Sequence, residues 1–535
     1  MKTLRNAVIA IFAGLILMIS CKKSDIALPK SEANIDSIAS KYYEGYLKMY
    51  PLEATMQGDS RYNDLLSNNI SSEFISKEIE FYTDTQKKLK SIEYDDLSDE
   101  QKTVYDVLDY TLKDKIERYA YHPELLPFSQ FEGLPLDFPL LGSAEGNQPF
   151  KTTQDYDNWL KRIDAFVIWM TTAEKNFREG MKQNVFLPKK LVVKMIPQMH
   201  SEEIITEDFD KNIFYGPIKK MPKNFSAKDK EKYKILYQEA ISSKIIPAYQ
   251  KMGDFLEKEY LPKARNTDGI NALPNGKNIY EYYAKSWTTT NKTPEEINKI
   301  GLQQVAMLRA EMEKVKTQLG FKGSLEEFLL SLKTDKKAMP FKTPEEVIAA
   351  FNGILKKIEP KLPSMFSKFP KTPFEIRRTE KFREASASAE YKQGTPDGKR
   401  PGIFYTPIPD ATKYNVTNGF ESLFLHEAIP GHHYQVSLQQ ENTEIPKFMR
   451  FGWFGAYGEG WAHYTETLGP EFGLYTDPYQ KMGYLSDQML RAVRLVVDTG
   501  IHTGKMTREE AIKYYLSNIS DSEEGATAAI ERYMA

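Results

Sequence analysis

Three histidines and one glutamate lie within the eight residues HEAIPGHH, positions 426–433. The whole chain has only seven histidines in 535 residues, and most of them fall in its last quarter. Imidazole nitrogens and carboxylate oxygens are the usual ligands of a catalytic zinc ion, which takes three protein ligands and leaves a fourth position for water. The clustering therefore predicts a metal site, with Zn²⁺ as the cofactor.

The spacing of this segment predicts a break in its helix. It begins like the zinc-protease motif His-Glu-x-x-His, but Pro430 stands where the second histidine would fall. On a regular helix a residue seven positions on lies about 10 Å further along the axis, which is too far for two nitrogens to share one ion at roughly 2 Å. Pro430 and Gly431 allow an excursion that brings a later histidine back beside His426. We predict His432 as that ligand, with His433 as the alternate.

A second segment, AYGEGWAHYTETLG at residues 456–469, is expected to supply the third ligand. On a helix, Glu459, His463 and Glu466 lie on one face, and two carboxylates with an imidazole are costly to bury without a partner. We predict Glu459 as the third zinc ligand, and Glu466 and His463 as outer residues, with Glu466 holding a ligand histidine. The alternative is a solvated helix face, which the neighbouring Trp461 and Tyr464 disfavour.

Glu427 follows the first histidine directly. It is predicted to be the general base, which takes a proton from the attacking water and passes it to the leaving amine.

Strand-like segments are scarce, and the best candidates are LVVKMI at residues 191–196 and GIFYTPI at residues 402–408. The second lies just upstream of the histidines, where a sheet edge would suit the binding of an extended peptide. Tyr405 within it is a candidate substrate-binding residue.

Charged residues also interrupt an apolar helix further along the chain, which is expected to stop at Gly500, just before His502. Two interpretations are open. Arg494 and Asp498, four residues apart, pair with each other. Alternatively, His502 is a catalytic donor to the tetrahedral oxyanion, and Arg491 or Arg494 anchors a substrate carboxylate.

The remaining pattern predicts a mostly helical protein with a small β element near the site. Apolar residues recur at three- and four-residue spacing, and Thr293 with Glu296 forms a capping box at the start of one such run. The stretch 387–402 is rich in turn-forming residues and is expected to be an ordered loop. The amphipathic runs are residues 35–51, 73–92, 98–119 and 293–319.

The N-terminus is typical of export. Residues 1–20 combine a basic start with an apolar run too short to span a bilayer comfortably, and Cys21 is the only cysteine. This segment resembles a bacterial lipoprotein signal, so we expect lipidation at Cys21, a tether over residues 21–34, and an anchor in the cell envelope, at the outer membrane of a Gram-negative bacterium. A formal net charge of −2 gives no reason to expect nucleic-acid binding.

Five ordered segments together resemble a known family: HEAIPGHHYQ, GEGWAHYTE, RLVVDTGIH, TREEAIKYY and the upstream TTTNKTPEEINKIGLQQVAMLRAEM. They resemble the bacterial DUF885 family, a domain of unknown function regarded as zincin-like and similar to the helical gluzincin peptidases. The resemblance spans residues 35–535. It implies a mostly helical, zincin-like (gluzincin) metallopeptidase fold and zinc peptidase activity, carried by His426, Glu427, His432 or His433, and Glu459.

A local similarity to dipeptidyl-peptidase III, whose motif is also lengthened and ends in Gly-His, favours His432. Two departures from DUF885 stand out. Position 463 is histidine where an aliphatic residue is usual. Relatives continue past the equivalent of Arg532-Tyr533 with a Pro-Gly segment and another helix, so we expect this chain to be short or C-terminally incomplete.

Three functions remain open at this stage. The first is an anchored zinc peptidase with peptide substrates, favoured because a pure binder has no need of Glu427 beside the metal. The second is a non-catalytic surface lipoprotein that binds peptide or glycan. The third is a zinc amidohydrolase of non-peptide amides, which uses the same chemistry. The sequence says nothing about oligomeric state.

Overall fold

The computed structural model describes residues 34–379, 384 and 388–535. The predicted signal peptide, Cys21 and all but the last residue of the predicted tether lie outside the described residues. Helix accounts for 65% of the structure and strand for 3%, so the predicted mostly helical class is confirmed. No helix in the described residues is both long enough and apolar enough to cross a bilayer.

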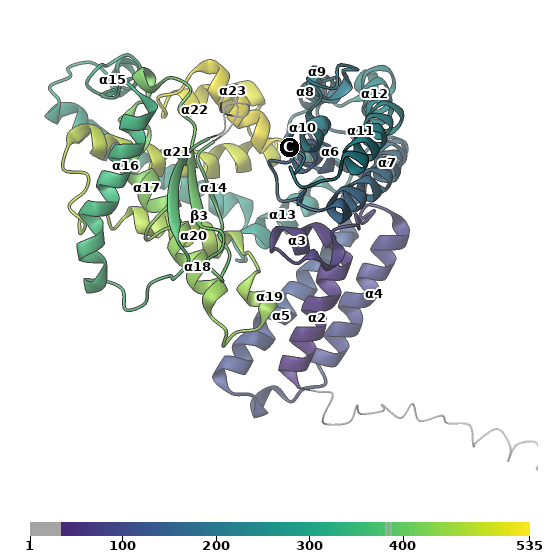
Figure 1. Ribbon diagram of the computed structural model, residues 1–535. Coiled ribbons are helices and arrows are strands. Elements are labelled where there is room, and N and C mark those ends of the chain that lie inside the picture. The colour runs from purple at the N-terminus through teal and green to yellow at the C-terminus, as the bar shows by residue number, and fades with distance from the viewer. Residues whose placement is uncertain (1–33, 380–383, 385–387) are drawn as a thin grey trace, which may run out of the picture.

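Two helical halves lie side by side (Figure 1), with the N-terminal half in purple to teal and the C-terminal half in green to yellow. The helices of the N-terminal half are α2 (Ile35–Met49), α3 (Pro51–Met56), α4 (Ser72–Leu89), α5 (Asp99–Arg118), α6 (Leu134–Gly142), α7 (Thr153–Lys182), α8 (Lys189–Met199), α9 (Glu202–Ile205), α10 (Gly216–Lys219), α11 (Ala227–Ala240), α12 (Ile246–Phe255) and α13 (Gly276–Thr288).

The C-terminal half carries the small sheet as well as helices. Its elements are α14 (Pro294–Gln318), α15 (Leu325–Leu332), α16 (Pro344–Ile358), β1 (Phe374–Arg378), β2 (Glu390–Lys392), β3 (Gly402–Thr406), α17 (Phe420–Glu427), α18 (His432–Glu441), α19 (Lys447–Arg450), α20 (Gly455–Glu466), α21 (Pro478–His502), α22 (Arg508–Leu516) and α23 (Glu523–Tyr533). Short 3-10 and π-helical segments connect or extend the helices of both halves.

The amphipathic runs read from the sequence form the helices that pack each half. α2, α4 and α5 bury their apolar faces in one bundle, and α7 packs with α8, α11 and α12 around a second, aromatic-rich core. In the C-terminal half α14 and α21 lie against each other. A Cβ atom at Gly301 of α14 would lie 2.8 Å from the Cβ of Leu495, so the glycine permits this close approach. The predicted capping box of Thr293 and Glu296 starts α14.

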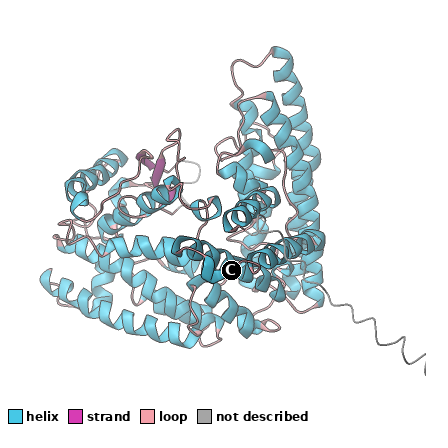
Figure 2. Ribbon diagram, turned by 90° about the horizontal axis from the view of Figure 1, so that it is seen from below, coloured by secondary structure: helices cyan, strands magenta, loops and turns pink. Residues whose placement is uncertain are grey.

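The sheet has the strand order β1–β3–β2, with β1 parallel and β2 antiparallel to the central strand β3. Figure 2 shows the strands in magenta among the cyan helices. The predicted strand at residues 402–408 is thus present as β3. The predicted strand at residues 191–196 is wrong, since these residues belong to α8. Leu191, Val192 and Met195 follow helical spacing and are buried, whereas Val193 is 49% exposed. The predicted loop at residues 387–402 also contains β2.

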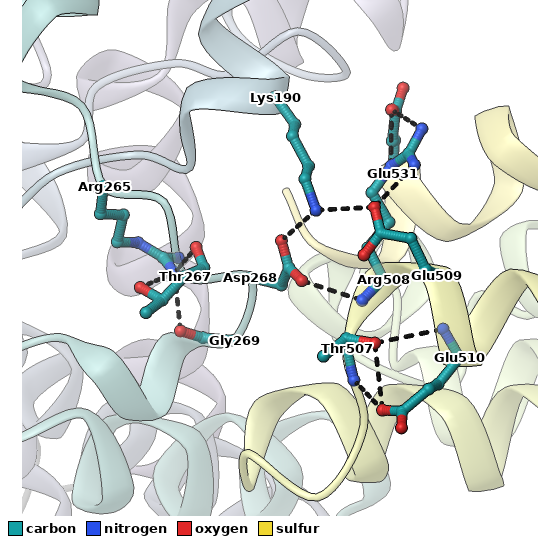
Figure 3. A network of polar contacts seen from close by, with 10 residues as sticks. All are labelled: Lys190, Arg265, Thr267, Asp268, Gly269, Thr507, Arg508, Glu509, Glu510 and Glu531. Carbon is teal, nitrogen blue, oxygen red and sulfur yellow. Dashed lines mark hydrogen bonds and ion pairs between the residues drawn. The ribbon is translucent and has the colours of Figure 1, made fainter.

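Polar contacts join the two halves (Figure 3). Lys190 of α8 bridges Asp268, at 3.1 Å, and Glu509 of α22, at 2.9 Å. The backbone N–H of Arg508 donates to Asp268 at 2.8 Å, and the Arg508 guanidinium donates to Glu531 of α23 at 2.6 Å. The network therefore fixes α22 and α23 against the N-terminal half.

Candidate metal centre

The predicted helix break lies between α17 and α18. α17 ends at Glu427 and α18 begins at His432, so the second histidine does not continue the first helix. A Cβ atom at Gly431 would lie 1.9 Å from the carbonyl oxygen of His426, which explains why glycine occupies this position. The indole Nε1 of Trp461, on α20, donates to the carbonyl oxygen of Pro430 at 2.7 Å. α20 thus holds the excursion in place.

His426 of α17, His432 at the start of α18 and Glu459 of α20 lie close together. Glu459 Oε2 lies 3.3 Å from His426 Nε2 and 3.7 Å from His432 Nε2, and one ligand atom from each residue lies within 4.8 Å of the others. Tetrahedral zinc with bonds of about 2.1 Å separates its ligand atoms by about 3.4 Å, so this donor set fits one zinc ion. Both histidines are buried, whereas the Glu459 side chain is 61% exposed, which leaves one side open to solvent.

His433 points away from this group. Its Nδ1 lies 3.1 Å from the Tyr391 hydroxyl and 3.4 Å from Ser437 Oγ, and its ring packs 4.8 Å from that of Phe374 on β1. Burial lowers the pKa of His433 to about 4. The fold therefore groups His432, rather than His433, with His426.

A chain of hydrogen bonds lies behind His426. Glu466 is fully buried, and its carboxylate accepts a hydrogen bond from His426 Nδ1 at 2.8 Å. The same carboxylate forms an ion pair with Arg491 at 2.7 Å and accepts a hydrogen bond from Gln488 Nε2 at 2.9 Å. His463 Nε2 donates to Gln488 Oε1 at 2.6 Å. The predicted contact between Glu466 and His426 is present. His463 is linked to Glu466 through Gln488, a residue that the sequence did not single out.

Electrostatics set the protonation of this group. Burial lowers the pKa of His426, but the hydrogen bonds with Glu459 and Glu466 outweigh burial and raise this pKa to about 9. The hydrogen bonds of Glu459 with His426 and His432 hold the pKa of Glu459 well below its usual value. A ligand histidine must be neutral, so the proton on His426 has to leave when a cation binds.

Glu427 lies beside the two histidines and is 8% exposed. Burial raises its pKa, and the neighbouring charges of His426 and His432 oppose this rise. Its carboxylate accepts no hydrogen bond from any residue that the structure describes. A buried carboxylate with a raised pKa and no protein donor is suited to proton transfer with water or substrate.

The helix carrying the predicted arginines does not stop at Gly500, because α21 continues through His502. Gly500 serves packing instead, since a Cβ atom there would lie 2.5 Å from Met506 Sδ. His502 Nδ1 accepts from the N–H of Ile270 at 3.1 Å, and His502 Nε2 donates to the carbonyl oxygen of Tyr533 at 2.8 Å. Both ring nitrogens are thus hydrogen-bonded to backbone groups, and neither is free to donate to an oxyanion.

The predicted pairing of Arg494 with Asp498 is wrong, because each has another partner. Arg494 Nε donates to the Tyr533 hydroxyl at 2.6 Å, and Asp498 accepts from the Tyr280 hydroxyl at 2.5 Å. Arg491 is engaged by Glu466, as described above. These partners lie far away in the sequence, so helical spacing gave no sign of them.

Tyr405 lies in the central strand β3, in register with Arg377 of β1 and Glu390 of β2. The sheet adjoins α18, since a Cβ atom at Gly402 would lie 2.5 Å from His433 Nδ1. The predicted proximity of a small sheet to the histidines is therefore confirmed. Tyr405 is not part of the group around His426, and its binding role stays a prediction.

One other group in the described residues has suitable donors for a cation, formed by His200, Asp254 and Glu257. Both of its carboxylates are exposed, and Asp254 is already paired with Lys258 at 3.0 Å. It has no buried carboxylate behind a histidine, in contrast to the Glu466–His426 arrangement.

Known structures share this architecture. The crystal structure of a "putative lipoprotein" from Colwellia psychrerythraea is 25% identical, with a TM-score of 0.84 over 94% of this chain and 89% of that one. A "putative lipoprotein of unknown function" from Shewanella oneidensis is 17% identical, with a TM-score of 0.69 and the same coverage, and shows similarity of fold. No curated protein matches the chain. The family model of bacterial proteins of unknown function called DUF885 matches residues 51–535, and the chain therefore belongs to the DUF885 family.

Proposed function

We propose that this protein is a zinc-dependent peptidase anchored to the cell envelope by a lipid on Cys21. The observation that carries the proposal is the convergence of His426, His432 and Glu459, with ligand atoms at separations that suit tetrahedral zinc. The buried Glu427 lies beside them. A metal-ligand group with an adjacent carboxylate base is the arrangement typical of zinc-dependent hydrolysis of amides.

The roles of the residues follow from their contacts. A zinc ion held by His426, His432 and Glu459 would polarise the scissile carbonyl and lower the pKa of water. Glu427 takes the proton from the attacking water and delivers it to the leaving nitrogen. Glu466 accepts from His426 Nδ1, which fixes the ring so that Nε2 faces the metal position.

Exposed aromatic side chains near the group favour a peptide over a small polar amide. The ring of Trp453 lies 5.7 Å from that of His432 and is 51% exposed. Trp287 and Tyr457 are 68% and 61% exposed, and a Cβ atom at Gly455 would lie 3.3 Å from Trp287. Exposed aromatic rings of this kind commonly mark binding surfaces. They offer apolar contacts to the side chains of an extended peptide.

The first test is the zinc content of the purified mature protein, by mass spectrometry of metals. We expect about one zinc per chain in the wild type and a large loss in Glu459→Gln, because the amide replaces an anionic ligand. His200→Asn is the matched control, since it removes a histidine from the other candidate group. Zinc retained in Glu459→Gln but lost in His200→Asn would contradict the assignment.

The second candidate function is a binding protein without catalysis, on the same scaffold. It shares the metal group but has no use for Glu427 as a base. Peptide binding by the zinc-loaded protein with no cleavage of any member of a peptide library would favour it.

The anchor has its own test. Cys21→Ala should abolish the incorporation of a labelled fatty acid into the protein in growing cells, because the thiol that would carry the lipid is absent. Equal labelling of the wild type and Cys21→Ala would contradict lipid anchoring at Cys21.

A further inference from the structure

The segment that joins α18 to α20, residues 442–454, carries four aromatic residues. Three of them pack against tyrosine rings of the N-terminal half, with ring centres 5.7–6.2 Å apart. The pairs are Phe448 with Tyr42 and Phe451 with Tyr43, both on α2, and Phe454 with Tyr110 on α5. The fourth, Trp453, packs instead beside the candidate metal centre.

Trp453 lies against two of the elements that supply the candidate ligands. The centre of its ring is 5.7 Å from that of His432. A Cβ atom at Gly458 would lie 2.2 Å from Trp453 Cη2, so the indole packs on the backbone of α20 next to Glu459. Single exposed aromatic residues are common on protein surfaces, so the exposure of Trp453 carries no weight alone. Its contacts place an apolar surface directly beside the position of the metal.

Hydrogen bonds fix the segment that carries Trp453. Gln439 Nε2, on α18, donates to the carbonyl oxygens of Met449 and Gly452 at 2.6 and 2.9 Å. The Arg450 Nε donates to the carbonyl oxygen of Gln440, also on α18, at 3.0 Å. Since α18 begins at His432, the same helix holds the candidate ligand and the segment that ends in the indole. An apolar surface that is already in position binds a side chain without the entropic cost of being ordered.

We propose that Trp453 forms the wall of a subsite that binds an aromatic side chain of the peptide substrate, so that the enzyme cleaves next to aromatic residues. The proposal rests on the peptidase function proposed above, and Trp453 determines specificity without taking part in proton transfer. Half of Trp453 is exposed, which leaves room for a second ring, and paired rings gain more than the area that they bury. An indole also attracts cations, but a lysine or arginine side chain here would be repelled by a zinc ion.

The experiment compares three peptides, acetyl-Ala-Ala-X-Ala-Ala-amide, in which X is Phe, Lys or Ala. We expect the Phe peptide to exceed the Ala peptide in kcat/KM by about tenfold to hundredfold, the range for burying one large apolar side chain. The Lys peptide should be no better than the Ala peptide, and mass spectrometry should place the cleaved bond next to Phe. Equal kcat/KM for Phe and Ala, or a Lys peptide as good as the Phe peptide, would overturn the proposal.

The variants assign the preference to Trp453. Trp453→Ala should reduce the Phe-to-Ala ratio of kcat/KM to about threefold or less, because the wall of the subsite is lost. The ratio within one protein does not depend on how much of that protein holds zinc, so a disturbed His432 does not imitate this loss. Trp453→Phe should keep most of the ratio, because it returns an aromatic ring. An unchanged ratio in Trp453→Ala would overturn the proposal.

Tyr94→Ala is the control for loss of an exposed aromatic side chain. Tyr94 is 38% exposed and lies in the connection between α4 and α5, so this variant should keep the full ratio. A ratio lowered equally in Tyr94→Ala and Trp453→Ala would contradict a subsite at Trp453.

A binding measurement separates this proposal from the peptidase function itself. The Phe and Ala peptides are titrated into zinc-loaded Glu427→Gln, with and without Trp453→Ala, by isothermal titration calorimetry, which needs no turnover. If the wild type cleaves no peptide, the peptidase proposal fails, but tighter binding of the Phe peptide that depends on Trp453 still supports the subsite. Equal binding of the two peptides overturns it, whatever the activity.

Discussion

Gly431→Ala tests whether the excursion between α17 and α18 positions His432. A Cβ atom at this position would lie 1.9 Å from the carbonyl oxygen of His426 and 2.2 Å from that of Leu425. These are backbone atoms of α17, which cannot rotate away as a side chain can. Since real contacts of this kind stay above about 3 Å, the two segments must separate by about 1 Å or more. Overpacking in an interior typically costs 1–3 kcal/mol, and we expect about 3 kcal/mol here.

This loss is smaller than the stability of a typical domain, so the variant should fold with a displaced His432. A shift of 1 Å at a reacting group costs about a hundredfold in rate. We therefore expect a lower midpoint in urea unfolding followed by circular dichroism, reduced zinc content, and activity lowered by about two orders of magnitude.

Gly353→Ala is the matched control. Gly353 is an exposed residue in the interior of α16, and a Cβ atom there would have no neighbour within 4 Å. The substitution should be neutral or stabilise the protein by about 0.5–1 kcal/mol, the advantage of alanine over glycine in a helix. If Gly431→Ala kept wild-type stability, zinc and activity, the packing argument for the excursion would be wrong.

The remaining predictions concern ligand choice, pH and the contact between α22 and α23. His432→Ala should lose zinc while His433→Ala keeps most of it, measured as metal per chain; the reverse would make His433 the ligand. Zinc affinity, measured with a competing chelator, should rise about tenfold per pH unit from pH 6 towards pH 9, because His426, with a pKa of about 9, must lose one proton to bind; a flat profile would contradict this. Arg508→Met should lower the free energy of unfolding by about 3 kcal/mol, because it leaves the buried Glu531 without its cation; a urea midpoint equal to that of the wild type would refute the role of this ion pair in joining α22 to α23.

Much of the helical framework was readable from the sequence, since packing of an amphipathic helix leaves a local period. α14 shows this, with its capping box and its buried face. The segment at residues 191–196 shows the limit, because six mostly apolar residues fit a strand as well as a turn and a half of helix. Val192, Met195 and Met199 of α8 pack into one core, and the other helices that form this core lie outside the six residues.

The candidate site also has a part that could be predicted from the sequence and a part that could not. The break at Pro430 and Gly431 followed from the geometry of one helix, and so did the shared face of Glu459 and Glu466. The partners of Arg494 could not be predicted, because Tyr533 lies 39 residues away along the chain. A contact between two helices depends on how they pack, and the sequence carries no local signal of it.

The most direct test of the peptidase proposal compares the wild type with Glu427→Gln, both loaded with zinc, in a peptide-library digest read by mass spectrometry. The two proteins are first shown to hold equal zinc, so that any difference reports proton transfer and not metal loss. We predict cleavage by the wild type, with rates at least about a hundredfold lower in Glu427→Gln, as expected for loss of a general base. Equal cleavage by both proteins, or no cleavage by a fully zinc-loaded wild type, would contradict the proposal.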